Sequence, residues 1–402
     1  MKTGYFFVIY IFIIGMKKRL FTLLFATTAI FSANAQLNGA GYYRVQNSST
    51  GRYMSLSDNT SRGVDFVSTS ADCGAMVTNS AWEVVSHDPG SVFYLEHITG
   101  ESYNVVGQGT SLHDIIDYYI YLTPVGKHYK AWQEEKGQRI TLTDNTDTDV
   151  TSYVTTTGNY SNWDILPIDA TNNYIGVKPT VTVGSKHYAA VFAGYPYTLG
   201  AGMKAYYISK IDEAKGVAVY KEITGTVPAK TPVLIECSST ETADNVVTPV
   251  VAADAVPSDN AAKGIYFCLG DQWSGHYNST KFDENSMRVL AVTADGKLAA
   301  TTSTEHLTSV IIKDRVDGKH PSILAIPANS WYLPVSGTAP SELIFVSESE
   351  YITGIESAPS VAQASSYTVF TLEGKQVMKN AKTLAGLSKG IYIINGKKVA
   401  VK

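Results

Sequence analysis

The feature that most constrains the fold is a short unit that occurs three times in the amino-terminal part of the chain. Its copies are YYRVQNSSTGRYMSLSDN (42–59), FYLEHITGESYNVVGQG (93–109) and HYKAWQEEKGQRITLTDN (128–145). Each copy has a strand-like alternation led by aromatic residues, a polar turn with a glycine, and a second alternation. Because one such unit cannot bury its own apolar face, the repetition predicts units of about 40 residues that share a core.

Two tryptophan-containing segments follow the first and third copies. They are SAWEVVSHD, with Trp82, and SNWDILPID, with Trp163. We expect both segments to be strands and both indoles to lie in the shared core, where each would bury about 200 Å². A sugar-stacking role for the two rings is the alternative.

The repeat, its G-x-Y-x-x-L/V turn and strand, and the two W-x-[VI] strands make residues 40–170 resemble the ricin-type β-trefoil lectin-like modules of secreted bacterial proteins. The resemblance implies a β-trefoil of three units with four short strands each, spanning residues 36–170. The Q-x-W signature of the family is absent, since Ser80 and Ser161 stand where its glutamine would be.

Two Asp-Asn pairs end the first and third copies of the repeat, Asp58-Asn59 and Asp144-Asn145. Lectins of the resembled family hold a pair of sugar hydroxyls with a carboxylate and an amide beside an aromatic face, so the pairs are candidate ligand-binding residues. Both residue types also form turns by bonding their own backbone, and that alternative stays open. The middle copy lacks the pair, so at most two lobes would bind.

The region from about residue 174 to 347 has longer strands punctuated by Pro and Gly, and it contains a second internal repeat. TVPAKTPVLIE (226–236) matches AIPANSWYLPV (325–335), with Pro228 and Pro327 at the same place before an apolar run. Proline fixes the backbone at the start of a strand. The match predicts two similar strand corners in facing halves of a β-sandwich-like domain over residues 171–350. This region resembles a module of Bacteroidota surface proteins, a likeness that implies no activity.

Between these two copies, CLGDQWSGHYNSTKF places Trp273 and Tyr277 in a polar stretch. Flat aromatic rings supply contact area at low entropic cost, so both are candidate ligand-binding residues. Closing one end of the sandwich is an equal alternative.

The last segment, 351–402, is expected to be a small β module of two hairpins. Its strongest local signal is Asn395-Gly396 between two alternating runs, which is typical of a type I′ turn. Gly390–Ile393 and the lysine-bearing end at Lys397–Lys402 resemble the type IX secretion C-terminal sorting domains of Bacteroidota. The likeness implies that the export machinery is a partner through this tail. The usual upstream Pro-Asn-Pro segment is missing, so either a shortened signal or a retained β domain is expected.

The amino terminus has the three parts of a secretory signal peptide. A basic start follows Met16, an apolar run covers residues 20–31, and a small-residue site predicts cleavage between Ala35 and Gln36. The upstream apolar piece is shorter than the roughly 20 residues of a spanning helix, so residues 1–15 are interpreted as an early start. We therefore expect an exported protein, outer-membrane surface or extracellular, with no transmembrane span in the mature chain.

Composition excludes several classes of function. The chain has 32 basic and 36 acidic side chains, and removal of residues 1–35 deletes four of the basic ones and no acid, which leaves a negative balance without the footprint of nucleic-acid binding. An abundance of Tyr, Thr, Val and Gly without long helical patterns favours an all-β chain. The three cysteines, Cys73, Cys237 and Cys268, lack CxxC spacing; a Cys237–Cys268 bridge and buried free thiols are both open.

No catalytic signature is present, and the sequence therefore predicts a non-enzyme. There is no G-x-S-x-G, H-E-x-x-H, phosphate loop or dinucleotide fingerprint, and the acidic run after Asn145 lacks the Gly and Glu of a calcium loop. No metal or cofactor is expected. The predicted function is an exported binding protein that recognises glycans or glycoproteins through the trefoil. The alternatives are a structural or adhesive surface component and a trefoil-type protease inhibitor.

Overall fold

The computed structural model describes residues 37, 40–58, 74–99, 102–107, 110–111, 119–145, 151–267, 281–311, 322–353, 355–357 and 366–401. The chain is mostly β, with 52% strand and 5% helix, which confirms the all-β class. The described helices are short: α2 (Trp82–Val85), α4 (Glu348–Thr353) and the 3₁₀ turns η1 (Pro89–Ser91) and η2 (Thr242–Asp244). The signal peptide with Ala35 and Gln36, and the candidates Asn59, Trp273 and Tyr277, lie outside the described residues.

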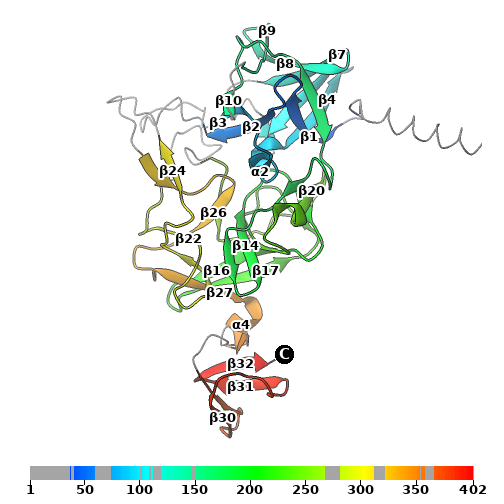
Figure 1. The fold of residues 1–402 in the computed structure, drawn as a ribbon. Coiled ribbons are helices and arrows are strands. Elements are labelled where there is room, and N and C mark those ends of the chain that lie inside the picture. Colours follow the sequence, from blue (N-terminus) through cyan, green and yellow to red (C-terminus); the bar gives the residue numbers. More distant parts are fainter. Residues whose placement is uncertain are drawn as a thin grey trace, which may run out of the picture.

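Six strands of the amino-terminal part form a closed antiparallel β-barrel at the top of Figure 1. In order around the barrel they are β1 (Gly41–Asn47), β11 (Trp163–Pro167), β8 (His128–Glu135), β7 (Ile120–Val125), β5 (Ser102–Gly107) and β4 (Phe93–Thr99). The barrel closes because β4 pairs with β1 again, with Tyr42 opposite Tyr94. No trefoil is identified as such, and that finer prediction stays a prediction.

Five further strands lie outside this ring: β2 (Tyr53–Asp58), β3 (Gly74–Asn79), β6 (Thr110–Ser111), β9 (Gln138–Thr141) and β10 (Thr151–Tyr153). The three predicted two-strand units are present, but they are not equivalent. The first and third pair a barrel strand with an outer strand, β1 with β2 and β8 with β9, whereas the middle one pairs two barrel strands, β4 with β5.

Trp163 lies at the centre of the barrel core, as the sequence predicts. Its side chain is fully buried, and its Nε1 donates to the carbonyl of Leu142. The predictions for Trp82 are wrong: it begins the helix α2 instead of lying on a strand, and it is only partly buried and outside the barrel cluster. Its ring packs on Tyr53 and Tyr174 and lies over the guanidinium of Arg44, at 5.1 Å. The indole therefore covers a buried cation at the barrel's edge.

The middle region forms a curled half-barrel sheet where a sandwich-like domain was predicted. Its order is β13 (Val181–Val183), β14 (Lys186–Val191), β19 (Val233–Cys237), β16 (Lys204–Asp212), β17 (Val217–Ile223), β27 (Glu342–Ser347), β23 (Leu298–Thr301), β22 (Met287–Val292), β26 (Ser330–Pro334) and β21 (Lys263–Ile265). A small sheet of β12 (Ile175–Gly176), β20 (Val246–Pro249), β15 (Tyr197–Leu199) and β18 (Thr226–Val227) and a hairpin of β24 (Thr308–Ile311) and β25 (Ser322–Ala325) accompany it.

The two copies of the second repeat adopt the same local turn. Lys230 and Asn329, which follow Pro-Ala in each copy, are both left-handed, with φ of 59° and 57°. The strands that follow, β19 and β26, lie toward opposite ends of the curled sheet. Curling brings the ends together, because Trp331 Nε1 donates to the carbonyl of Val233 at 2.6 Å.

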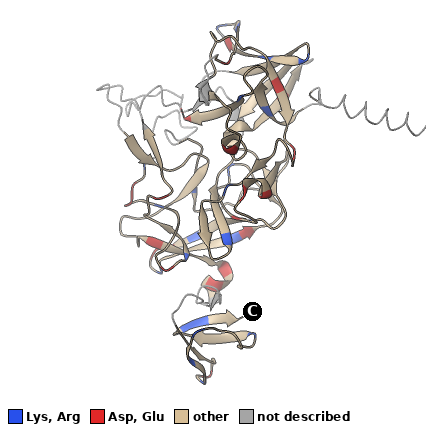
Figure 2. Cartoon of the chain, viewed as in Figure 1, with Lys and Arg blue, Asp and Glu red and all other residues tan. Residues whose placement is uncertain are grey.

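The carboxy-terminal unit is a separate small sheet of β28 (Ile355–Ser357), β32 (Lys397–Val401), β31 (Gly390–Ile394), β29 (Tyr367–Phe370) and β30 (Gln376–Ala381). The type I′ turn is supported, since Asn395 and Gly396 have φ of 48° and 83°. Figure 2 shows acidic residues on α4, between the half-barrel sheet and this unit, and basic residues on β32. The buried hydrophobic cluster of the carboxy-terminal unit contains only residues of that unit.

The barrel and the half-barrel sheet share hydrophobic cores. Phe192, Tyr266 and Phe267 belong to the barrel cluster, and Val92 of the barrel segment belongs to a cluster of the middle region. The strands before and after the predicted boundary near residue 170 therefore belong to different sheets, but their buried side chains share hydrophobic clusters. Among the described residues, no helix combines the length and the apolar character that a membrane crossing requires.

Candidate functional site

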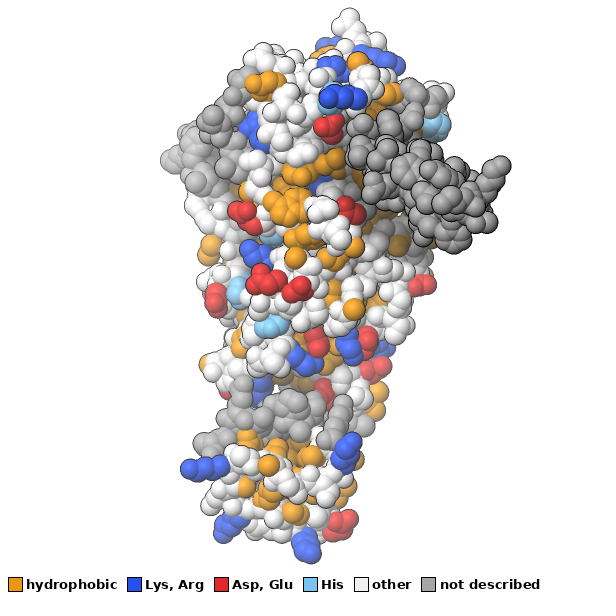
Figure 3. Space-filling view, turned by 45° about the vertical axis from the view of Figure 1, so that its right-hand side comes forward, with side chains coloured by type: hydrophobic (Ala, Val, Ile, Leu, Met, Phe, Trp, Pro, Cys, Tyr) orange, Lys and Arg blue, Asp and Glu red, His pale blue; other side chains and the backbone are white. Residues whose placement is uncertain are grey.

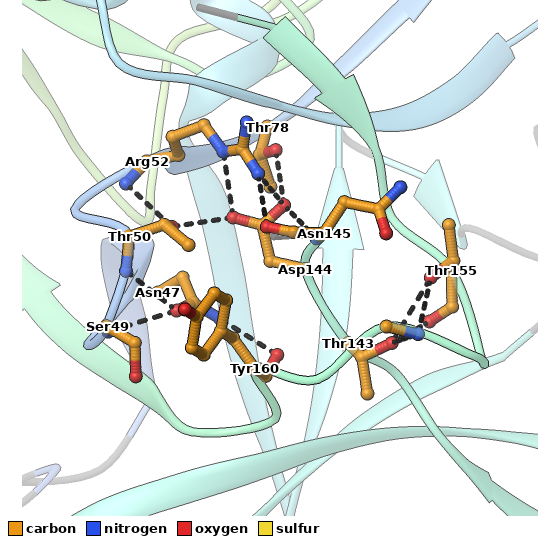
Figure 4. A network of polar contacts seen from close by, with 11 residues as sticks. Asn47, Ser49, Thr50, Arg52, Thr78, Thr143, Asp144, Asn145, Thr155 and Tyr160 are labelled. Carbon is orange, nitrogen blue, oxygen red and sulfur yellow. Dashed lines mark hydrogen bonds and ion pairs between the residues drawn. The ribbon is translucent and has the colours of Figure 1, made fainter. Parts of the chain in front are cut away.

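The predicted ligand Asp144 lies inside a polar network at the edge of the barrel (Figure 4). Its side chain is fully buried and forms an ion pair with Arg52, whose Nη2 is 2.8 Å from Oδ1 and whose Nε is 2.9 Å from Oδ2. The hydroxyls of Thr50 and Thr78 donate to the two carboxylate oxygens, at 2.6 and 2.9 Å. A buried carboxylate is stable only with such partners.

The contacts of Asp144 are all made within the protein. The backbone N–H of Asn145 also donates to its Oδ1, which is the local bonding that the turn alternative describes. The carbonyl of Asn145 accepts a hydrogen bond from Arg52, so this pair ties the third copy of the repeat to the first. Both carboxylate oxygens are therefore occupied, and the structure gives Asp144 a structural role.

Of the other candidates, Asp58 ends β2 and is half-buried, and Asn145 is half-buried beside Asp144. The structure does not bring Asp58 to the Asp144 network, whose contacts come from Arg52, Thr50, Thr78 and Asn145. Asp58 and Asp144 thus belong to separate places on the barrel.

A second buried cation, Arg44 of β1, joins the barrel to the middle region. Its guanidinium donates to the side chains of Ser91 and Asn173 and to the carbonyls of Val85 and Tyr174, at 2.8–3.1 Å. All four acceptors are neutral, and burial lowers the pKa of this arginine. The bonds reach from β1 to residues beyond β11, so they fix the barrel against the segment that starts the half-barrel region.

A cavity of about 530 Å³ lies between the barrel and the half-barrel sheet, a size within the range of small-molecule pockets. The barrel contributes β2, β3 and the turn after α2; the other wall comes from β14, β22 and the start of β26. Most of the lining is apolar. Among the described residues, the ionisable side chains on the lining are His87, Asp88, Lys178, Tyr266 and His306.

Asp88 is the acid of this cavity, and its oxygens are already bonded. Its Oδ2 accepts from the Ser55 hydroxyl, and its Oδ1 accepts from the backbone N–H of Gly90 at 2.8 Å and from the Asn329 amide at 3.4 Å. Burial raises the pKa of Asp88, although these bonds and the charge of Arg44 oppose the shift. The bond to Asn329 crosses from the barrel to the left-handed turn before β26.

Besides Asp88 and Tyr266, the titratable side chains on the described lining of the cavity are basic. His87 is half-buried, and burial together with the nearby charge of Lys178 lowers its pKa. Lys178 is exposed at the rim, and His306, before β24, is half-buried. The cavity thus combines apolar walls with one bonded acid and three groups that can carry positive charge.

Another hollow is an open groove of about 490 Å³ at the β1–β4 pair, which we call the tyrosine groove. Tyr42 of β1 and Tyr94 of β4 lie side by side in it, with ring centroids 5.2 Å apart. Tyr195 of the middle region completes the aromatic wall, 5.6 Å from Tyr42. Burial and the neighbouring Tyr94 raise the pKa of Tyr42 to about 12, so its hydroxyl stays protonated.

The rim of the tyrosine groove is exposed and mainly apolar. Val251 and Val256 leave 68% and 50% of their surface exposed, and Asp254 lies between them in the sequence and is exposed as well. The side of the molecule that carries β1, β4 and β20 comes forward in Figure 3, where hydrophobic side chains gather between acidic residues. Large exposed apolar patches on soluble proteins mark interaction sites.

A third aromatic group, on the outer side of β7 and β8, is less suited to a ligand. Tyr121 stacks on one face of Trp132 at 4.4 Å, and the guanidinium of Arg139 lies over Trp132 at 4.0 Å. Trp132 is almost fully buried, and its Nε1 donates to Thr123. Its ring is therefore covered by the protein's own side chains.

Among the described residues, no group of three or more His, Cys, Asp and Glu side chains is placed to hold a metal ion. Cys237 is a buried free thiol, and burial raises its pKa to about 12. This agrees with the alternative in which the cysteines act as small apolar residues. Cys73 and Cys268 lie outside the described residues.

Comparison of the chain with protein-family models, curated proteins and solved structures finds no match. What the two hollows can bind must follow from their own residues. The Asp-Asn pairs stand out in the sequence, whereas Tyr94, Tyr195 and Asp254 do not. The aromatic-led starts of the first two copies of the repeat contain Tyr42 and Tyr94, but only the closure of the barrel places them side by side.

Proposed function

We propose that the protein is an exported, non-catalytic binding protein that recognises a glycan or glycoprotein in the tyrosine groove. The observation that carries the proposal is the pair of adjacent rings, Tyr42 and Tyr94, in a groove whose lining also includes the exposed Asp254. A sugar ring presents polarised C–H groups on its faces and hydroxyls at its edge. Aromatic faces pack against the C–H groups, and a carboxylate accepts hydrogen bonds from the hydroxyls.

The shape of the groove supports a ligand with extended contact. It is open and about 490 Å³ in volume, which lies within the range of ligand-binding sites. Tyrosine side chains have only two rotatable bonds, so they lose little entropy on contact. Tyr195 is almost fully buried and packs against the ring of Tyr42. This contact preorganises the Tyr42 ring for ligand binding.

The barrel order supports the further proposal that this part of the chain is a β-trefoil. Three successive segments each contribute two barrel strands: β1 and β4, then β5 and β7, then β8 and β11. The first and third segments also carry the outer strands β2, β3, β9 and β10, and β10 pairs with β3. A trefoil has this threefold plan, with a shortened second unit in this chain. The resemblance to lectin-like modules that the sequence suggests depends on this threefold plan.

Export is the second part of the proposal. The signal-peptide pattern before Gln36 and the sorting-domain-like carboxy terminus support secretion to the cell surface or the medium, with the export machinery as a partner. The compact sheet at 355–401, with a core of its own, suits a terminal signal that folds separately. Mass spectrometry of the exported protein would show whether this unit is removed.

The test is a glycan array probed with the mature chain 36–402, followed by titration of the best glycan against variants. Tyr94→Ala is expected to weaken binding at least tenfold, which corresponds to about 1.4 kcal/mol. Asp254→Asn should weaken it by a smaller factor, because it removes charge and keeps the shape. Tyr119→Ala is the matched control, since Tyr119 is 43% exposed and lies outside the groove.

The alternatives make different predictions in the same experiment. A structural or adhesive component would bind no glycan on the array. A protease inhibitor would block a panel of serine and cysteine proteases with Tyr94→Ala unchanged. Binding that persists in Tyr94→Ala and Asp254→Asn would contradict a site in the tyrosine groove, and Asp58→Ala would then test the lobe predicted from the sequence.

A further inference from the structure

We propose that the cavity between the barrel and the half-barrel sheet is a second binding site, for a small ligand that carries a carboxylate or phosphate group. This site is distinct from the tyrosine groove. None of the groove residues Tyr42, Tyr94 and Asp254 lines the cavity. The proposal therefore does not depend on glycan binding in the groove.

The cavity has the form of a ligand site. Its volume of about 530 Å³ accommodates one sugar-sized molecule with room for water, and its walls come from two separately built sheets. Apolar side chains such as Leu56, Val191 and Leu290 form most of the surface. A few polar groups stand against this background, which is how small-molecule pockets fix the orientation of a ligand.

The polar groups favour an anion. Asp88 is the one carboxylate on the described part of the lining, and its two oxygens accept hydrogen bonds from Ser55, Gly90 and Asn329. It therefore has little capacity left for a cationic ligand. The remaining ionisable groups of the same lining include Lys178 and the two histidines, His87 and His306, all of which carry positive charge when protonated.

The electrostatics of His87 agree with this assignment. Burial and the charge of Lys178 both lower its pKa, so the cavity without a ligand disfavours a protonated His87. The other titratable side chains on the described lining of the cavity are Asp88 from its own turn, Lys178 from the segment after β12, Tyr266 after β21 and His306 from the loop before β24. An anion beside them favours protonation, and by linkage its affinity rises as pH falls.

The position of the cavity gives the ligand a second effect. The bond of Asp88 to Asn329 and the bond from the Gly176 backbone N–H to the Ser86 carbonyl join the two walls directly. A ligand that contacts both walls adds to these few links. It should therefore raise the thermal stability of the whole chain by mass action.

The experiment is isothermal titration of the mature chain 36–402 with three matched probes: glucuronate, glucose 6-phosphate and glucose. The first two carry a carboxylate or a phosphate on the sugar framework of the third. We expect at least one charged probe to bind tenfold or more tightly than glucose. Glucuronate binding, if it is the stronger, should tighten between pH 7.5 and 5.5, a range in which its own carboxylate stays ionised.

The variants are chosen so that a loss of ligand binding can be distinguished from a loss of folding. Lys178→Ala removes an exposed side chain and should weaken binding of the charged probe at least fivefold, and His87→Gln should abolish its pH dependence. Lys127→Ala, an exposed lysine in the turn between β7 and β8, is the control and should bind as the parent does. Tyr94→Ala reports on the tyrosine groove instead.

Each outcome decides the proposal. Preference for glucuronate assigns a carboxylate ligand, and preference for glucose 6-phosphate assigns a phosphate ligand. The proposal is overturned if no charged probe binds, if glucose binds equally well, or if Tyr94→Ala and not Lys178→Ala reduces the affinity. The last result would place the anion in the tyrosine groove.

Discussion

At the scale of single residues, the barrel depends on a buried ion pair that ties the first and third copies of the repeat together. Arg52 and Asp144 are almost completely removed from water, and each is surrounded by further hydrogen-bond partners. The desolvation of two charges is repaid only while both partners are present. The same residue that the sequence offered as a sugar ligand is thus a structural anchor.

Asp144→Asn should lower the free energy of unfolding by about 3–5 kcal/mol, because it leaves Arg52 buried without a counter-charge. Urea denaturation of the mature chain measures this. The matched control is Asp164→Asn, which breaks the more exposed pair with His128 and should cost less than about 1 kcal/mol. Equal denaturation midpoints for the two variants would contradict the structural role of Asp144.

Asp88 gives a pH-dependent prediction. Burial raises its pKa, so the folded state binds this proton more tightly than the unfolded state does. The resulting stability is fully present below the unfolded pKa of about 3.9 and is lost as pH rises through the folded pKa. Asp88→Asn removes this loss, and its thermal midpoint should therefore gain on the parent as pH rises from 4 to 7.

Asp169 is a control for Asp88, because its pKa is shifted in the opposite direction. In Asp169, burial raises the pKa, but hydrogen bonds from the backbone of Asn173, Thr171 and Asn172 outweigh it and lower the pKa overall. Asp169→Asn should therefore lose stability relative to the parent as pH rises from the lowered folded pKa to the unfolded value of about 3.9, and the difference should be nearly constant above that pH. A midpoint difference for Asp88→Asn that does not change with pH would show that Asp88 titrates normally.

At the scale of elements, local signals were predictable and long-range pairings were not. The turns at Gly51, Gly137 and Asn395-Gly396 have the positive φ values that their residue types favour, and the sequence located each of them. Trp82 was misassigned because a short apolar segment between polar stretches fits a strand or a helical turn equally well. The sequence also aligned three units as equivalents, whereas closure of the barrel by the β4–β1 pair makes the middle unit a junction between segments.

The sequence could not place the tyrosine groove or the cavity, for a physical reason. Each combines side chains from strands far apart in the chain, and their meeting depends on sheet closure and on the packing of the two regions. The matching turns at Lys230 and Asn329 could be found because their Pro-Ala pattern is local. No local pattern in the sequence indicates that Asn329 donates a hydrogen bond to Asp88 across the cavity.

Gly264 on β21 tests how the barrel and the half-barrel sheet are joined. A Cβ at this position would overlap the ring of Phe192, which packs in the barrel core against Tyr266 at 4.4 Å. Gly264→Ala should therefore destabilise the chain by about 1–3 kcal/mol through overpacking. Gly337→Ala, which has open space around its Cβ, is the control and should be neutral in thermal unfolding. Equal effects of both would show that the shared core tolerates displacement of Phe192.

At the scale of the whole molecule, two parts behave as one body and a third is separate. The barrel and the half-barrel sheet share clusters, the Arg44 bonds and the walls of both hollows. The carboxy-terminal sheet has its own core and follows the short helix α4 (Figure 1). This organisation fits a binding unit of two interlocked regions that carries a terminal export signal.

The most direct test of the central proposal is a crystal structure of the mature chain with the glycan that binds best on the array. We predict a sugar ring packed against Tyr94 or Tyr42, about 4 Å from the aromatic face, with a hydroxyl within hydrogen-bond distance of Asp254. Electron density for the glycan at another place on the barrel, with the tyrosine groove empty, would contradict it.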